Sequence, residues 1–317
     1  MLGKTIEVNI GKQSTFAVPT TLPRKKLNVY GVSGGLTENF VDDNILDGGT
    51  VDDSDPTEPA PGLDDHKITI KGPVCCNQMQ WWLAAFFGDA DSSGTAPDYE
   101  HQWATGQALP IIFMERKFGA AYRRDIGLVG ESFSIDFSAE QEGFQQFEMT
   151  FVGLKELQAS SALAGTVAAA PELVRPAAKL VNIVYNGTNG GDLIGGKFSY
   201  SRKLKRIRSA DGTGLPYKVV QDGRATLTTS LMTRYEDDTF ADDGISRAER
   251  AVSIELMADA ARGLKLAFDK HRINRTPLNA EGPDGIELNF EGRAFKKGSD
   301  RAMVVRALSG AATVAFA

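Results

Sequence analysis

Cysteine is nearly absent from the chain, and no stretch is apolar enough to cross a membrane. The two cysteines among 317 residues, Cys75 and Cys76, are adjacent, so they are poorly placed for a structural disulfide and are expected to be free and reduced. No apolar run approaches the roughly 20 residues of a membrane helix, and the opening MLGKTIEVNI has no apolar signal core. We therefore expect a cytoplasmic product with no membrane partner.

The chain also lacks an excess of basic charge. Its 35 Lys and Arg residues stand against 41 Asp and Glu residues, which gives a formal net charge of −6. Neutralising phosphates requires a net basic surface or a large basic patch, so this balance disfavours a protein that wraps around nucleic acid. It does not disfavour a surface past which nucleic acid slides without sticking.

Residue patterns typical of enzymes are missing as well. The three histidines, His66, His101 and His271, are expected singly in loops or at strand ends, and none has a partner at metal-ligand spacing. There is no GxSxG, HExxH or P-loop sequence, and the glycine pairs lack the strand-to-helix context of a phosphate-binding loop. We name no catalytic, cofactor-binding or metal-binding residue, and we expect a protein that is not an enzyme and uses no cofactor.

What the chain does contain is alternation with a period of two, which is clearest between Glu131 and Phe151. Phe133, Ile135 and Phe137 alternate with Ser and Asp, and after a polar turn at residues 139–143 the same pattern returns. Side chains of a strand point alternately to opposite faces, so this pattern predicts a hairpin. Its Phe-rich face would cover a core, and its polar face would meet water or a neighbouring subunit.

Similar alternation recurs in both halves of the chain, with charged or polar residues at the intervening positions. It predicts a mainly β protein built from half-buried antiparallel sheet. Besides the hairpin, strands are expected at residues 66–71, 109–118, 120–129, 180–185, 223–232, 252–256, 264–268, 286–290 and 303–307, with a further strand beginning at Phe198. Less regular structure is expected at residues 1–20 (an arm or an edge strand), 27–49 (short strands and loops), 89–107 (a polar loop) and 246–250 (a helical turn).

A helix is predicted from Asn77 to Phe87, with Asn77 as a cap and Gly88 as its end. Four large apolar residues between Met79 and Phe86 share one face, whereas Trp81 and Phe87 fall outside it. This distribution indicates burial against a sheet on one side and against a second surface on the other. Packing is favoured over the alternative, an aromatic ligand pocket.

Two segments divide the chain. Residues 51–65 hold six carboxylates and three prolines without Lys or Arg, and we favour a solvated or interface loop there over a calcium site, because the spacing lacks the alternating ligands and closing Glu of a calcium loop. Residues 158–177 are rich in Ala and Pro and mark a linker. The length favours two domains, which we place at residues 1–157 and 178–317.

Charge is concentrated in two segments of the second half. Residues 202–208 hold five basic side chains, and residues 236–243 hold five acidic ones. Alternation cannot bury such runs on one strand face, so both are expected to project, either as solvated loops or as complementary contacts between copies of the protein. The candidate inter-subunit contacts are Arg202, Lys203, Lys205, Arg206, Arg208, Glu236, Asp237, Asp238, Asp242 and Asp243, together with Trp81 and Phe87.

Taken in order, these features resemble the phage tail tube proteins of long-tailed siphophages, of the double-domain type. The resemblance covers essentially the whole chain. It rests on the strand HKITIKG followed by CCNQMQWWLAAFFG, on FMERKFGAAYRRDIGLVGESFSIDFSAEQEGFQQFEMTFVGL, on the Ala/Pro linker, and on GGKFSYSRKLKRIR with QDGRATLTTSLMTRYEDD in the second half.

This resemblance implies two tandem antiparallel β-sandwich or rolled-sheet domains, each with a short flanking helix. Three subunits would close a ring of pseudo-sixfold symmetry, and stacked rings would form a hollow virion tail, assembled in the host cytoplasm, through which double-stranded DNA passes without specific binding. Its partners would be itself and other tail proteins: the tape measure, the terminator and the baseplate hub. Arms toward a neighbouring ring are expected at residues 1–23, 36–65 and 236–250.

Two alternatives belong to other classes of protein. The first is a β-sandwich receptor-binding or capsid-decoration protein, which would form a discrete oligomer with affinity for a glycan or a capsid. The second is a carbohydrate-active enzyme on a β-sandwich, which would lose its activity when one carboxylate is changed.

Overall fold

Strands make up most of the protein, as expected from the alternating sequence. The structure is a computed structural model and describes residues 6–42, 59–96, 98–106, 109–138, 140, 142–189, 193–210, 215–234, 239–276 and 287–310. Its elements are β1 (Ile6–Gln13), β2 (Arg24–Leu27), β3 (Gly31–Thr37), β4 (Phe40–Val41), β5 (Ala60–Pro61), β6 (Asp65–Pro73), α1 (Met79–Phe87), β7 (Asp91–Thr95), β8 (Asp98–Ala104), β9 (Ile111–Phe118), β10 (Ala121–Ser138), β11 (Gln146–Val152), β12 (Lys155–Ala159), β13 (Val167–Ala168), the 3₁₀ turn η2 (Ala178–Leu180), β14 (Val181–Tyr185), β15 (Thr188–Asn189), β16 (Leu193–Ser201), β17 (Leu204–Arg208), β18 (Pro216–Gln221), β19 (Thr226–Arg234), α2 (Thr239–Ser246), β20 (Arg250–Met257), β21 (Gly263–Ile273), β22 (Glu287–Ala294) and β23 (Val304–Ser309). In the described part of the chain, no helix is both long enough and apolar enough to span a membrane.

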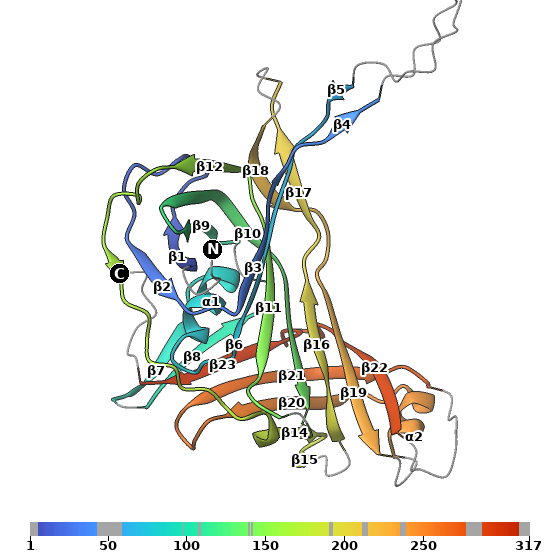
Figure 1. The fold of residues 1–317 in the computed structure, drawn as a ribbon. Coiled ribbons are helices and arrows are strands. Elements are labelled where there is room, and N and C mark those ends of the chain that lie inside the picture. The colour runs from blue at the N-terminus through green and yellow to red at the C-terminus, as the bar shows by residue number, and fades with distance from the viewer. Residues whose placement is uncertain are drawn as a thin grey trace, which may run out of the picture.

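One antiparallel sheet passes through both halves of the chain (Figure 1). Its strand order is β3, β6, β11, β10, β16, β19 and β22. The predicted hairpin is confirmed as β10 and β11, in which Ile135 lies opposite Phe147. On its other edge β10 pairs with β16, where Ile135 lies opposite Phe198. The Phe-rich face of the first half therefore continues into the second half.

A second layer runs across the lower part of Figure 1. It contains β14, β20, β21, β23, β8 and β7 in that order, and β21 also meets β22 of the first sheet over three residue pairs. Because β8 belongs to the first half and β23 to the second, both halves contribute to this layer too. The core lies between the layers, as in other sandwiches of two sheets.

A third group of strands shares β10 with the first sheet. Residues 121–128 of β10 pair with β9 and β12, and the order is β12, β10, β9, β1, β2 and β13. The register of β10 shifts near Gly127, which has a φ of 68°. A Cβ atom there would lie 2.7 Å from Cγ of Leu154. Glycine thus permits the bulge at which β10 passes from one sheet to the other. The strand predicted at residues 120–129 and the first strand of the predicted hairpin are therefore one continuous strand.

Helix α1 fills the core, and its nine residues are all buried. Phe86 contacts Phe133, Phe151 and Tyr200, which come from both halves of the first sheet. Both the helix and its burial on all sides are confirmed, as is its end at Gly88. The residue before the helix is Gln78 rather than Asn77, and its side chain does not cap the helix.

Three local predictions differ from the structure. Residues 89–107 were expected to be a polar loop, but they contain β7 and β8, because His101 and Trp103 of β8 alternate inward and are fully buried. The helical turn expected at 246–250 lies earlier in the chain, as α2. Residues 6–13 are strand β1 with β2 on one side and β9 on the other, instead of a free arm or an edge strand.

Candidate functional site

The basic segment at residues 202–208 divides between the interior and the surface. Arg202 is 2% exposed, and its Nη1 donates a hydrogen bond of 2.8 Å to the carbonyl oxygen of Phe86. Its guanidinium carbon lies 4.6 Å from the centre of the Phe86 ring, a cation–π contact. The prediction that the whole segment projects is therefore wrong for Arg202, which follows the inward alternation of β16.

Two further arginines of this segment bind the beginning of β6. Arg206 donates to the carbonyl oxygens of Gly153 and His66, at 3.1 and 2.5 Å, and pairs with the carboxylate of Asp65. Arg208 donates to the carbonyl oxygen of Asp64 at 2.7 Å. These contacts lie within one chain and hold β17 against β6. The exposed cations of the segment are Lys203 and Lys205.

The acidic run is also divided. Glu236, Asp237 and Asp238 lie outside the described residues, and Asp242 is exposed on α2. Asp243 is buried, however, and accepts hydrogen bonds from Tyr185 and from Arg250. Burial acts to raise the pKa of Asp243, but these hydrogen bonds outweigh it and hold the pKa below its usual range.

Through these hydrogen bonds Asp243 links α2 to β14, which holds Tyr185, and to β20, which holds Arg250. Burial also raises the pKa of its partner Tyr185, and the neighbouring Asp243 carboxylate adds to that effect. The prediction that the acidic run projects is wrong for Asp243, because its carboxylate is needed inside the chain to pair with Arg250.

Trp81 and Phe87, the two aromatic candidates, pack inside the protein. Phe87 is fully buried and contacts Phe133 and Tyr200. Trp81 is 7% exposed, with the ammonium group of Lys25 4.7 Å from its ring centre. Both side chains thus belong to the core around α1 and offer little surface to another chain.

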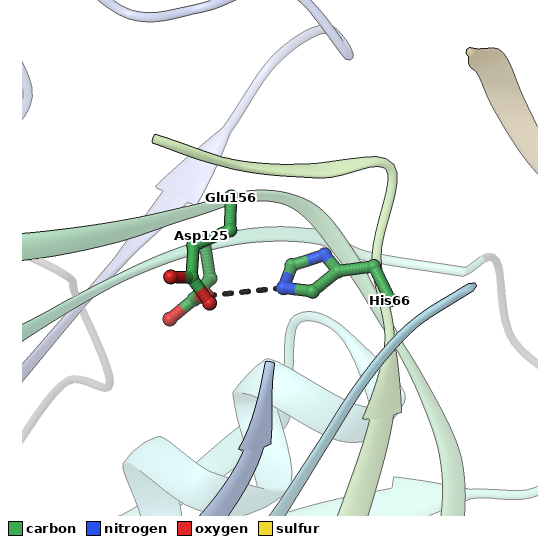
Figure 2. Close-up of side chains that lie close together, drawn as sticks. All are labelled: His66, Asp125 and Glu156. Atoms are coloured by element: carbon green, nitrogen blue, oxygen red, sulfur yellow. Dashed lines mark hydrogen bonds and ion pairs between the residues drawn. The ribbon is translucent and has the colours of Figure 1, made fainter. Parts of the chain in front are cut away.

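A buried charge network, which the sequence did not reveal, lies beside the bend of β10. His66 Nε2 lies 3.0 Å from Asp125 Oδ1, and Figure 2 shows Glu156 beside them. Arg116 donates to both oxygens of Asp125, at 2.7 and 2.9 Å, and to Glu156 Oε2 at 2.9 Å. The same arginine donates to the carbonyl oxygen of Gly34 in β3. The network therefore joins strands β3, β6, β9, β10 and β12.

The residues in Figure 2 are of the types that bind metal ions. Ligand atoms of His66, Asp125 and Glu156 lie within 4.8 Å of one another. The guanidinium of Arg116, however, bonds to both carboxylates of this cluster and supplies the positive charge that a metal ion would supply. The arrangement fits a structural ion-pair network and does not fit a metal centre.

A second buried ion pair holds the Ala/Pro-rich segment. Arg24 and Glu115 pair with less than 2% of either side chain exposed. Glu115 accepts a hydrogen bond from the backbone nitrogen of Leu163 at 2.7 Å, and Arg24 donates to the carbonyl oxygen of the same residue. Leu163 itself is buried against Phe113 and Ile126. The sequence gives no signal for this pair, because residues 112–116 of β9 are all buried and the strand does not alternate between an inner and an outer face.

The hairpin of β4 and β5 exposes large apolar side chains. In Figure 1 it stands away from the sheets, beyond the paired ends of β3 and β6. Phe40, Val41 and Leu63 on this hairpin are 69%, 57% and 63% exposed. Single exposed apolar residues are ordinary, but several on one protruding hairpin make it a candidate interaction surface.

Comparison with known proteins identifies a family whose model matches the chain. A family model described as "phage tail tube protein" matches residues 3–294, which extend from β1 to the end of β22. No curated protein matches the chain.

Proposed function

Because the chain belongs to the phage tail tube protein family, we propose that it polymerises into stacked rings that form the hollow tail of a siphophage. Members of this family are structural components of the virion and not enzymes. Double-stranded DNA would leave the capsid through the lumen. The observation that carries the proposal is the family match, because it extends over both halves of the chain.

Each ring would consist of three chains with pseudo-sixfold symmetry. The two tube domains would be residues 1–157 and 178–317, joined by the linker at 158–177. Pairing of β10 with β16 supports this arrangement, since it extends one sheet from the first half into the second. Sheet edges in neighbouring chains offer the same kind of backbone pairing, by which a ring can close.

The outer face of β6, β11, β10 and β16 is the candidate lining of the lumen. It lies opposite the Phe-rich core face and carries small polar side chains such as Ser134 and Ser199. Its lysines are paired with carboxylates: Lys67 with Glu131 at 2.6 Å, Lys71 with Glu148 at 3.1 Å and Lys197 with Asp136 at 3.0 Å. A surface whose cations are already paired attracts phosphates weakly, so DNA would slide along it.

Assembly in the host cytoplasm, with the tape measure, terminator and baseplate hub as partners, belongs to the same proposal. The test is negative-stain electron microscopy of the purified protein at several concentrations. Hollow tubes or stacked rings that lengthen with concentration are expected. Discrete particles of one size at every concentration, with affinity for a glycan or a capsid, would contradict the proposal in favour of a receptor-binding or decoration protein.

A further inference from the structure

A cleft of about 660 Å³ lies between the end of β16, the residues before β19 and the loop that follows β22. Four of the residues that line it are cations: Arg202, Arg224, Lys296 and Arg301. None of the lining residues in the described ranges is Asp or Glu. In a chain with a net charge of −6, this cleft is a local concentration of positive charge.

Arg202 forms the inner wall of this cleft and is incompletely bonded. Its Nη1 donates to the backbone oxygens of Phe86 and Gly130, but its Nη2 is buried with no hydrogen-bond partner. Burial lowers the pKa of Arg202, and the hydroxyl of Tyr200 offsets part of that effect. Because Nη2 is buried, Arg202 contributes positive charge to the inner wall, and the exposed cations are the ones that a ligand can contact.

The three outer cations of the cleft are exposed, and none forms an ion pair with a described residue. In this they differ from a basic residue nearby. Lys297, the residue next to Lys296, pairs with Glu249 at 2.6 Å. The charges of Arg224, Lys296 and Arg301 are therefore available to a carboxylate from outside the described part of the chain.

The chain itself contains a segment of matching charge. Residues 43–58 hold six Asp and Glu side chains and no Lys, Arg or His. They connect β4 with β5, on the protruding hairpin whose apolar side chains are exposed. In Figure 1 this hairpin leads away from the sheets.

We propose that the cleft is a carboxylate-binding site for residues 43–58 of a second copy of this chain. The inference rests on the proposed polymerisation and specifies one contact that holds it together. Arginine binds carboxylates in a bidentate manner, and Arg224 and Arg301 are the exposed arginines of the cleft. Phe40, Val41 and Leu63 would be covered by the same contact. Exposed charge pairs are screened by salt, so the contact weakens as ionic strength rises.

The test exchanges the charges of the two partners. The cleft variant carries Arg224→Glu, Lys296→Glu and Arg301→Glu, and leaves the buried Arg202 in place. The segment variant carries Asp52→Lys, Asp53→Lys and Asp55→Lys. Each variant alone should raise the protein concentration needed for polymers by about tenfold or more without lowering the melting temperature, because like charges then meet. The combined variant should polymerise as the wild type does.

A disulfide experiment reports the contact directly. Chains with Asp53→Cys are mixed with chains carrying Arg301→Cys under polymerising conditions, and mixed dimers are measured on a non-reducing gel. The matched control replaces Arg301→Cys by Arg262→Cys, which is exposed on the turn between β20 and β21. The native Cys75 and Cys76 are buried and stay in every variant. Cross-linking is expected in the first mixture only.

The outcomes separate this inference from the function on which it rests. If the wild type forms no polymers, the proposed function fails. If the wild type polymerises and the cleft variant does so at the same concentration, with no preferential cross-link, the carboxylate site is wrong while the function stands. If the cleft variant loses only affinity for duplex DNA, the cleft serves phosphates and the inference is likewise overturned.

Discussion

Arg116 binds Asp125 through two hydrogen bonds, of 2.7 and 2.9 Å, at the point where β10 passes from one sheet to another. Asp125 is fully buried, so its charge is compensated by this arginine and not by water. The pair thus stabilises the bend that joins the two sheets.

The first prediction concerns this pair. Asp125→Asn removes the more deeply buried of the two carboxylates that Arg116 binds, and should lower the free energy of unfolding by about 3 kcal/mol. Asp136→Asn is the matched control, because Asp136 is 69% exposed in its pair with Lys197, and it should cost less than about 1 kcal/mol. Denaturant unfolding of the unpolymerised chain measures both. Equal losses would show that the buried network is not what stabilises the bend.

The second prediction concerns metal ions at the same network. Since Arg116 supplies the positive charge beside Asp125 and Glu156, neither a chelator nor added Zn²⁺ or Mn²⁺ should change the melting temperature by more than about 1 °C. Thermal unfolding with and without each ion is the measurement. A concentration-dependent stabilisation by one ion, lost in Glu156→Gln, would contradict the assignment as an ion-pair network.

These buried pairs also show what the sequence could and could not predict. The β10–β11 hairpin and helix α1 were predictable, because their apolar residues repeat with a clear period. Strand β8 was missed because polar residues surround the inward His101 and Trp103. Its partner β23 lies about 200 positions away, where Trp103 meets Val305, and local periodicity does not encode such pairing.

The charged candidate residues likewise show that the local sequence does not determine which side chains are buried. A run of cations predicts that charge is present but not which side chain turns inward, and the structure separates the buried Arg202 from the exposed Lys203 and Lys205. Similarly, Glu115 and Asp125 are charged residues in strands, and only the fold shows that arginines from other strands meet them.

The third prediction uses His271. Burial lowers its pKa from 6.5 to about 4. The unfolded chain therefore binds a proton between pH 6.5 and pH 4 that the folded chain does not, so stability falls as the pH drops through this range, by about 3 kcal/mol. In His271→Gln this part of the pH dependence should disappear. Unfolding free energies at pH 7.5 and pH 4.5 test it, and an unchanged slope in the variant would contradict the prediction.

The fourth prediction concerns the basic segment as an inter-subunit contact. Lys203→Glu with Lys205→Glu should weaken polymerisation at an unchanged melting temperature, because both side chains are exposed. Arg206→Glu should instead lower the melting temperature, because Arg206 binds Gly153, His66 and Asp65 within the chain. Unchanged polymer length in the lysine variant would remove the segment from the proposed interface.

The fifth prediction concerns the lining of the lumen. Replacing Asp136→Lys and Glu148→Lys releases Lys197 and Lys71 from their ion pairs and adds positive charge to the same face. Tubes should still form but should retain duplex DNA, more strongly at low salt. The matched control is Asp259→Lys, on the turn between β20 and β21. Co-sedimentation of DNA with the assembled tubes measures retention, and equal retention by all three proteins would place another face toward the lumen.

A tail tube protein must form a hollow tube. The most direct measurement is the cross-section of the assembled protein by cryo-electron microscopy. We expect rings of three chains around an open lumen, with the outer face of β6, β11, β10 and β16 toward the axis. Filaments without a lumen, or discrete oligomers that do not stack at any concentration, would contradict this expectation.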